Sequence, residues 1–182
     1  MRRLRAHEDA RVIVELRQYT LKPGQRDTLV DIFERHFVHT QQAVGITLIG
    51  LFHDLDNPDK FVWLRGFPDM ESRRTALAAF YEHGEAWQTH GPAANATMID
   101  SDDVLLLRLL GKTATEVVHG QYTAIISPDP VVVADPVLSF EPYVTENTYP
   151  RLPVRADKMY VSIQPGDGKG LRLKPTAGSA MR

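Results

Sequence analysis

Residues that end helices are concentrated in the last two fifths of the chain. Residues 111–182 hold fourteen of the twenty-four glycines and prolines, and the longer segment 1–110 holds ten. Proline has no backbone N–H and clashes with the preceding helical turn, so ordinary helices cannot form at this density of prolines. The sequence after Gly111 therefore predicts strands and loops, whereas the sequence before it can also form helices.

Strand and helix patterns alternate in the first part of the chain. Apolar and β-branched runs predict four strands, at 12–19, 46–52, 60–67 and 104–110. Apolar residues at helical spacing predict a helix from Gln25 to Val44 and a second from Met70 to about Met98, interrupted at Gly84 and at Gly91-Pro92. This order predicts an α+β fold built on a ferredoxin-like βαββαβ unit.

The predicted strands differ in how many of their faces are apolar. In 46–52 and 104–110 apolar residues occupy successive positions, which is typical of a sheet covered on both faces. The predicted helices can cover only one of these two faces. Later runs, at 121–126, 138–141, 158–164 and 171–174, alternate apolar with polar residues and so have one dry face. We expect the two sheets to stack face to face, within a chain or across a dimer. The alternative is that the later strands are edge arms around the first domain.

Composition narrows the classes of partner and chemistry. Twenty-one Lys and Arg residues against twenty-three Asp and Glu residues leave no basic excess for a nucleic acid backbone. The chain has no cysteine, which excludes disulfides, thiol nucleophiles and cysteine-held metals. No apolar run approaches the roughly 20 residues that span a bilayer, and Met1 to Arg11 lacks the apolar stretch of a secretory signal. We expect a cytoplasmic protein with no nucleic acid partner and no membrane span.

Several words of the sequence resemble the NIPSNAP family, in the same order. They are Glu15 to Gly24 (ELRQYTLKPG), Phe61 to Phe67 (FVWLRGF), Ala76 to Tyr81 (ALAAFY) and Asn95 to Asp100 (NATMID). The resemblance spans residues 12–110 and implies a domain of the dimeric α/β-barrel group, in which two ferredoxin-like units pack sheet to sheet. It also implies a homodimer or a higher homo-oligomer.

Longer members of that family carry a second copy of the unit. Residues 146–155 and 171–176 resemble the later part of such a copy, but the segments where its helices would lie are too short to form them. The resemblance therefore implies that residues 115–182 are a truncated second repeat, mostly β-strand and poor in helix.

Charged and aromatic residues share one face of the central strands. Glu15, Arg17 and Tyr19 alternate along the first strand, and Trp63 and Arg65 along the third. Buried charges are costly unless they are paired, so one interpretation is a Glu–Arg network that sets the register of the two layers. The other is a pocket in which Arg17 or Arg65 binds a carboxylate or other small anion between aromatic walls.

The interrupted second helix supplies further candidates. Trp87 and Asn95 are predicted ligand-binding residues, and Tyr81 and His90 are candidates for proton transfer. The alternatives are that Trp87 is a core residue and that His90 and Asn95 are surface residues of a loop. His36 and His39 could share a helix face, but no third ligand is evident, and we expect neither a metal nor a cofactor.

Two classes of function remain open at this stage. The first is a barrel that binds a small hydrophobic or carboxylated molecule. If such a barrel is catalytic, the likeness of fold alone suggests a cofactor-independent monooxygenase-like enzyme. The second is a non-enzymatic interaction or scaffold protein, because the NIPSNAP resemblance implies no settled catalytic activity.

Overall fold

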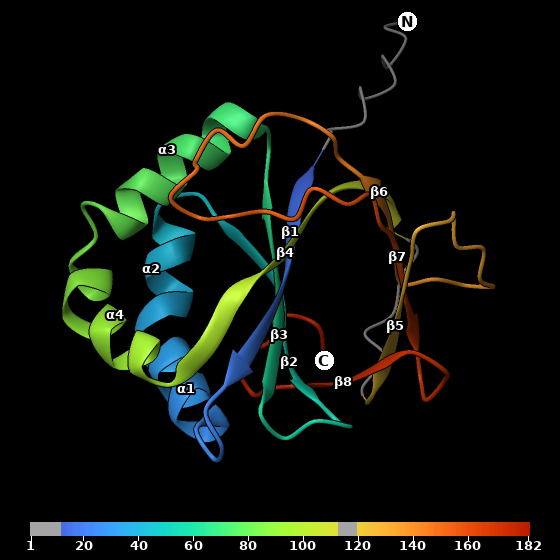
Figure 1. Cartoon of the computed structure of the whole chain (residues 1–182), viewed down its shortest axis with the longest axis horizontal. Coiled ribbons are helices and arrows are strands. Elements are labelled where there is room, and N and C mark those ends of the chain that lie inside the picture. The colour runs from blue at the N-terminus through green and yellow to red at the C-terminus, as the bar shows by residue number, and fades with distance from the viewer. Residues whose placement is uncertain (1–11, 113–119) are drawn as a thin grey trace, which may run out of the picture.

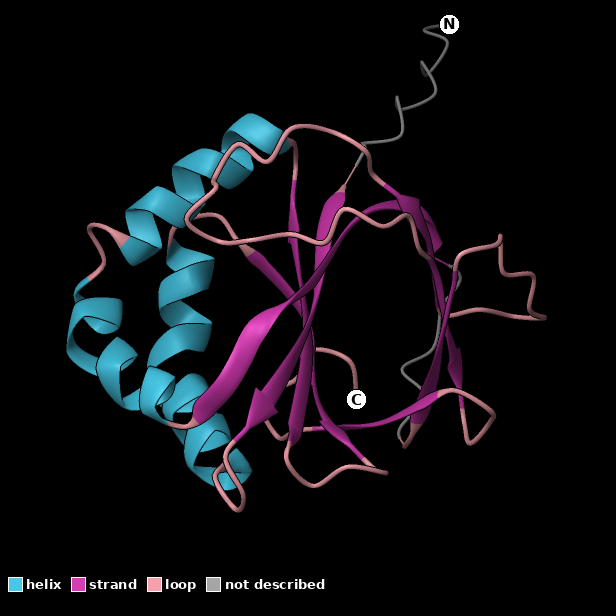
Figure 2. Ribbon diagram, viewed as in Figure 1, coloured by secondary structure: helices cyan, strands magenta, loops and turns pink. Residues whose placement is uncertain are grey.

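Eight antiparallel strands form one closed barrel, and the helices pack on one side of it (Figure 1, Figure 2). The computed structural model describes residues 12–112 and 120–182, so the prediction for Met1 to Arg11 lies outside the described residues. None of the helices formed by these two segments has the length and apolar character needed to cross a bilayer.

Residues 12–112 form the mixed α/β part of the molecule. Its strands are β1 (Ile13–Leu21), β2 (Thr47–Asp54), β3 (Lys60–Phe67) and β4 (Met98–Lys112). The first helical segment consists of α1 (Arg26–Ile32), the π-helical turn η1 (Phe33–Phe37) and α2 (Val38–Ala43), and the second of α3 (Met70–Tyr81) and α4 (Glu85–Ala96). The predicted order of strands and helices is confirmed, and the strands lie side by side as β2-β3-β1-β4.

Strand β4 is longer than predicted. It begins at Met98 rather than at Val104, because its polar first half pairs with the end of β1, where Thr20 lies opposite Asp100 and Leu21 opposite Met98. Aspartates at 100, 102 and 103 disfavour a strand in a local reading of the sequence. The pairing with β1 overrides that local preference.

The second helical segment has one break rather than the two predicted. The chain leaves the helix between Tyr81 and Glu85, as predicted at Gly84, but α4 continues through Gly91 and Pro92. Gly91 lies against the indole of Trp87, where a Cβ would come within 2.8 Å of the ring. The absence of a side chain at position 91 therefore lets Trp87 fold back along its own helix.

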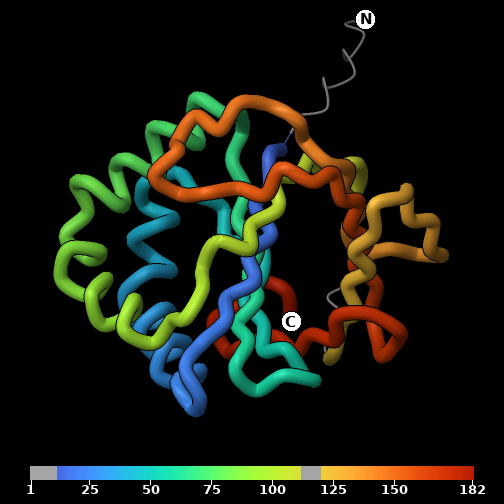
Figure 3. Tube along the Cα trace, in the orientation of Figure 1, coloured from blue at the N-terminus to red at the C-terminus, as the bar shows by residue number. Residues whose placement is uncertain are grey.

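Residues 120–182 supply the other half of the barrel. Their strands are β5 (Tyr122–Ser127), β6 (Leu138–Pro142), β7 (Tyr160–Pro165) and β8 (Leu171–Pro175), in the order β8-β5-β7-β6. Strand β8 pairs with β2 and strand β6 pairs with β4, so both edges of the first sheet are joined to the second within one chain (Figure 3). The later strands are thus part of the barrel wall and not arms around a separate domain.

Two apolar cores lie on opposite faces of the first sheet. The barrel interior is filled by alternate residues of both halves, including Leu16, Leu64 and Leu107 facing Phe140 and Ile163. The second core lies between the outer face of the same strands and the helices, and it is rich in aromatic rings. The two-sided apolar pattern of the first strands is explained by these two cores.

Candidate functional site

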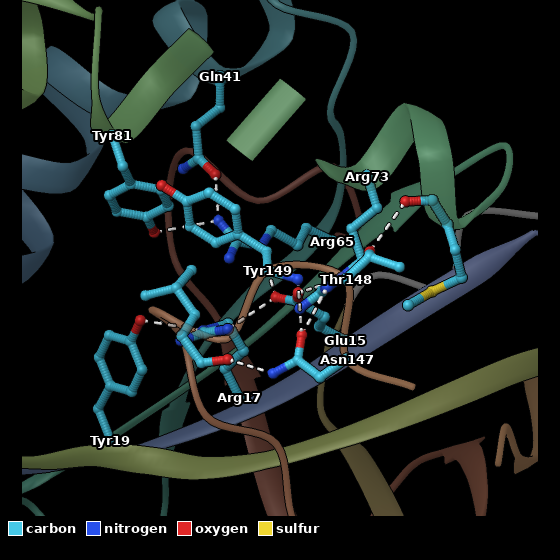
Figure 4. Close-up of polar contacts among 12 residues, drawn as sticks. Glu15, Arg17, Tyr19, Gln41, Arg65, Arg73, Tyr81, Asn147, Thr148 and Tyr149 are labelled. Atoms are coloured by element: carbon cyan, nitrogen blue, oxygen red, sulfur yellow. Dashed lines mark hydrogen bonds and ion pairs between the residues drawn. The ribbon is translucent and has the colours of Figure 1, made fainter. Parts of the chain in front are cut away.

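A single buried carboxylate on β1 binds three arginine side chains on the helix side of the barrel (Figure 4). Glu15 Oε2 accepts hydrogen bonds of 2.7 Å from Arg17 Nη1 and from Arg65 Nε. Glu15 Oε1 accepts a third, also of 2.7 Å, from Arg73 Nε. All four side chains are at most 2% exposed, so this cluster, called here the arginine cluster, is inside the protein.

Strand register and helix position bring these residues together. Residues 15, 17 and 19 point to one face of β1, and the pairing of β1 with β3 sets Arg65 opposite Glu15 and Trp63 opposite Arg17. Arg73 comes from α3, where it lies on the same helical face as Leu77 and is buried with it. The predicted Glu–Arg network is therefore present, but it joins the sheet to a helix and does not lie between the two sheets.

The arginine cluster carries more positive than negative charge. Three guanidinium groups surround one carboxylate, which leaves a net formal charge of two, and among the described residues these arginines form no other ion pair. Burial alone would raise the pKa of Glu15, but the three guanidinium groups outweigh it and hold that pKa well below its ordinary value. Glu15 therefore stays ionised, and the excess of positive charge is permanent at neutral pH.

Two donors of the arginine cluster are buried without a hydrogen-bond partner among the described residues. They are Nη2 of Arg65 and Nη2 of Arg73, and the indole N–H of Trp63 is in the same situation. Buried donors of this kind cost free energy unless an acceptor reaches them. The chemistry of this region therefore favours an acceptor, and its charge favours an anion.

A cavity of about 210 Å³ lies beside the arginine cluster, between the sheet and the helices. The Arg17 guanidinium reaches it, and the aromatic rings of Tyr19, Trp63, Tyr81 and Trp87 form much of its wall. The remaining wall is formed by Leu29, Phe33, Phe37, Gln41, Phe80, Asn95, Met98, Ser101, Arg151 and Leu152. The cavity is outside the barrel, whose interior is filled by side chains.

Two phenols link the arginine cluster to the cavity. Arg17 Nε donates a hydrogen bond of 3.0 Å to the hydroxyl oxygen of Tyr19, and Arg65 Nη1 donates one of 3.1 Å to that of Tyr81. Burial raises the pKa of Tyr19 above its ordinary value, although Arg17 acts in the opposite direction. Tyr19 is therefore protonated at neutral pH, and its O–H can donate to a ligand while its oxygen accepts from Arg17.

The structure brings most of the predicted site residues together. Arg17, Tyr19, Trp63, Tyr81, Trp87 and Asn95 all line the cavity. Arg65 lies just behind the cavity wall, where its guanidinium is 4.9 Å from the Trp63 ring centroid and binds Glu15.

His90 lies away from this cavity. Its imidazole stacks on that of His36, with ring centroids 3.5 Å apart, in a separate groove of about 510 Å³ between the first and second helical segments. Within residues 12–112 and 120–182, no three His, Asp or Glu side chains gather in a way that could hold a metal ion.

The candidates predicted from the sequence do not include three residues of the site. Arg73 lies between Ser72 and Arg74, and its spacing relative to Leu77 is the one clue that it lies on the apolar face of the helix. Gln41 accepts a hydrogen bond of 3.0 Å from Arg65, and Arg151 reaches the cavity from the loop between β6 and β7. A polar residue in a loop does not show which distant cavity it reaches, so only the three-dimensional arrangement reveals Arg151.

The model of the NIPSNAP family matches residues 14–111, which is more than half of the chain. The chain belongs to the NIPSNAP family. This match covers β1 to β4 and the helices, and with them the arginine cluster, whereas Arg151 and the strands β5 to β8 lie beyond it. A search among curated proteins finds no match.

Two solved structures of NIPSNAP proteins from Agrobacterium tumefaciens share the fold of this part of the chain. A NIPSNAP family protein from Agrobacterium tumefaciens is 21% identical, with a TM-score of 0.51 over 57% of this chain and 90% of that one. A second, of unknown function and from the same organism, is 19% identical, with a TM-score of 0.50 over 56% and 91% of the two chains. A NIPSNAP-like domain protein from Burkholderia xenovorans is 26% identical over 59% and 90%, with a TM-score of 0.48.

Proposed function

We propose that this NIPSNAP protein binds a small organic anion with a flat, apolar body in the cavity beside the arginine cluster. The observation that carries the proposal is the net positive charge of the arginine cluster, which is buried and reaches the cavity through Arg17. Arginine binds carboxylates through a planar pair of donors, and such charge-assisted bonds are stronger than neutral ones. A ligand carboxylate at Arg17 would offset part of the uncompensated charge.

The aromatic wall favours a flat ligand body. Tyr19 and Trp63 meet edge to face at 5.9 Å, and Tyr81 and Trp87 at 4.7 Å, so the rings support one another and present apolar surfaces to the cavity. A volume of about 210 Å³ equals that of about seven water molecules at ~30 Å³ each. The ligand is therefore of the size of a benzoate ion and not of a large cofactor.

Binding is better supported than catalysis in this cavity. The described part of its lining contains no His, Asp or Glu side chain, and the groups able to exchange a proton are the phenols of Tyr19 and Tyr81. Glu15 cannot act as a base, because its pKa is held low by the three arginines. The phenols fit a role in donating hydrogen bonds to the bound anion.

Sodium benzoate, with neutral benzamide as its charge control, tests this proposal. Benzoate at ten times its Kd should stabilise the protein by about 1.4 kcal/mol, which raises the Tm by about 3–6 °C for a chain of this size. Arg17→Gln should weaken benzoate binding about tenfold or more in a calorimetric titration, because a hydrogen bond to a charged group is lost. Benzamide should bind far more weakly than benzoate.

Arg108→Gln is the matched control for this experiment. Arg108 binds Glu141 across β4 and β6 at a half-exposed position outside the cavity, so its loss removes the same charge without touching the ligand. Equal benzoate affinity of the wild type and Arg17→Gln, or no benzoate binding beyond that of chloride at the same ionic strength, would overturn the proposal.

We further propose that residues 115–182 are the shortened second copy of a ferredoxin-like unit whose first copy is residues 12–110. The support is the strand order: β6-β7-β5-β8 repeats β2-β3-β1-β4 when the strands of each half are numbered from their own start. The joins β4–β6 and β2–β8 then correspond to each other as well. A homodimer and a cytoplasmic location stay predictions, the first of which a native mass measurement tests.

A further inference from the structure

A segment of the C-terminal half crosses to the helices and reaches the cavity. After β6 the chain leaves the barrel, runs to α3 and returns to β7, as the orange tube shows (Figure 1, Figure 3). Residues 147–152 of this segment, called here the strap, contribute Arg151 and Leu152 to the cavity wall. The strap lies outside the residues that the family model matches.

Hydrogen bonds to the arginine cluster and to α3 hold the strap in place. Asn147 Oδ1 accepts a bond of 3.1 Å from Arg73 Nη1, and its Nδ2 donates one of 2.8 Å to the carbonyl of Leu152 (Figure 4). Thr148 Oγ1 donates to the carbonyl of Met70 at 3.1 Å. Arg73 of the arginine cluster thus holds one end of the strap, and the Asn147 amide closes the strap into a compact turn.

The middle of the strap is anchored by Tyr149. This side chain is 6% exposed, and its hydroxyl donates a hydrogen bond of 2.8 Å to Glu82 Oε1 at the end of α3. The backbone N–H of Leu152 donates to the carbonyl of Tyr149 at 3.1 Å. Arg151 therefore projects from a backbone that is fixed on both sides.

Arg17 and Arg151 approach the cavity from different depths. Both residues line the cavity, but Arg17 is 2% exposed whereas Arg151 is exposed. Arg151 lies beside the Tyr149 phenol. No carboxylate of the described residues is within ion-pair distance of Arg151, and the nearby Glu82 accepts a hydrogen bond from Tyr149. The cavity lining thus contains one buried and one exposed cationic group together with aromatic side chains.

We infer that Arg151 forms a second anion subsite at the cavity mouth, so that the ligand class is a flat molecule with an acidic group at each of two positions. This inference rests on the proposed function, since it needs the first acidic group to bind at Arg17. An exposed ion pair gains less than a buried one, and we expect the second acidic group to improve affinity about fivefold.

The test compares benzoate with its three dicarboxylate counterparts, phthalate, isophthalate and terephthalate, by calorimetric titration at constant ionic strength. For the wild type at least one of the three should bind about fivefold more tightly than benzoate. In Arg151→Gln the ratio of the two affinities should fall to about one. Lys158→Gln removes the same charge from an exposed position in the same loop, outside the cavity, and should keep the wild-type ratio.

The possible outcomes separate this inference from the proposed function. The inference is overturned if none of the three dicarboxylates binds more tightly than benzoate, if the advantage survives Arg151→Gln, or if Lys158→Gln removes it equally. In each of those cases benzoate binding that depends on Arg17 still supports the proposed function. Loss of benzoate binding itself overturns the proposed function and this inference together.

Discussion

Replacing Glu15 by glutamine tests the energetics of the arginine cluster directly. The substitution keeps the shape of the side chain, removes its charge and turns one acceptor oxygen into a donor that faces guanidinium N–H groups. Removing one partner of a buried ion pair costs about 3–5 kcal/mol, and Glu15 serves three partners, all at 2.7 Å. At about 2–4 °C for each kcal/mol, the Tm should fall by about 6–20 °C.

Glu141→Gln is the control with the same change of charge. Glu141 binds only Arg108 in the described structure and is 27% exposed, so its loss should cost no more than about 1 kcal/mol and about 4 °C. Thermal unfolding followed by circular dichroism at neutral pH measures both variants. The reasoning fails if Glu15→Gln lowers the Tm no further than Glu141→Gln does.

Acid titration gives a second, independent readout of the same variant. Because the folded-state pKa of Glu15 lies below its ordinary value of 4.5, its ion pairs contribute stability above that pH and lose it as the pH falls through the folded-state pKa. The difference in Tm between the wild type and Glu15→Gln should therefore shrink below about pH 4.5. A difference that stays constant down to pH 3 would contradict the assignment of the stabilisation to the Glu15 charge.

Two further predictions concern the strap and the barrel wall. Tyr149→Phe removes the hydrogen bond to Glu82 and should lower the Tm by about 2–4 °C at neutral pH. Burial, followed by Glu82, raises the pKa of Tyr149 from 10.0 to about 12. The difference in Tm between the wild type and Tyr149→Phe should therefore be full below pH 10 and decline as the pH rises towards 12. A pH-independent difference in Tm would contradict this prediction. Deletion of residues 115–182 should expose the apolar barrel face of β1, β3 and β4. The truncated protein should then aggregate or form oligomers, which light scattering measures. A soluble product with unchanged stability and native mass would show that the later strands are dispensable.

The parts of the fold that local patterns determine could be predicted from the sequence. Prolines and glycines mark where helices cannot form, and apolar spacing separates strands from helices, so the order of the elements follows from short segments. The start of β4 could not be predicted in this way, because the pairing of Asp100 with Thr20 depends on a partner far away in the sequence. The closure of the barrel by β6 and β8 is equally non-local.

The same distinction between local patterns and distant partners applies to the residues of the candidate site. Arg17, Tyr19, Trp63 and Arg65 alternate on strands, and this pattern alone indicates a shared face. The spacing of Arg73 relative to Leu77 puts it on the apolar face of α3, but its bond to Glu15 depends on how α3 packs against β1. Arg151 depends on a loop whose path is fixed by hydrogen bonds to residues about eighty positions earlier, such as that from Thr148 to Met70.

Closure of the barrel also decides how other molecules can approach this protein. A strand at the edge of an open sheet offers unpaired N–H and C=O groups to which a foreign strand can add. Here every strand of the described residues has a neighbour on both sides, including β2 and β4, which would be edges in the first sheet alone. Pairing with β8 covers β2 at residues 52–54, and pairing with β6 covers β4 at residues 107–112, so a partner strand finds neither of these edges open over its full length.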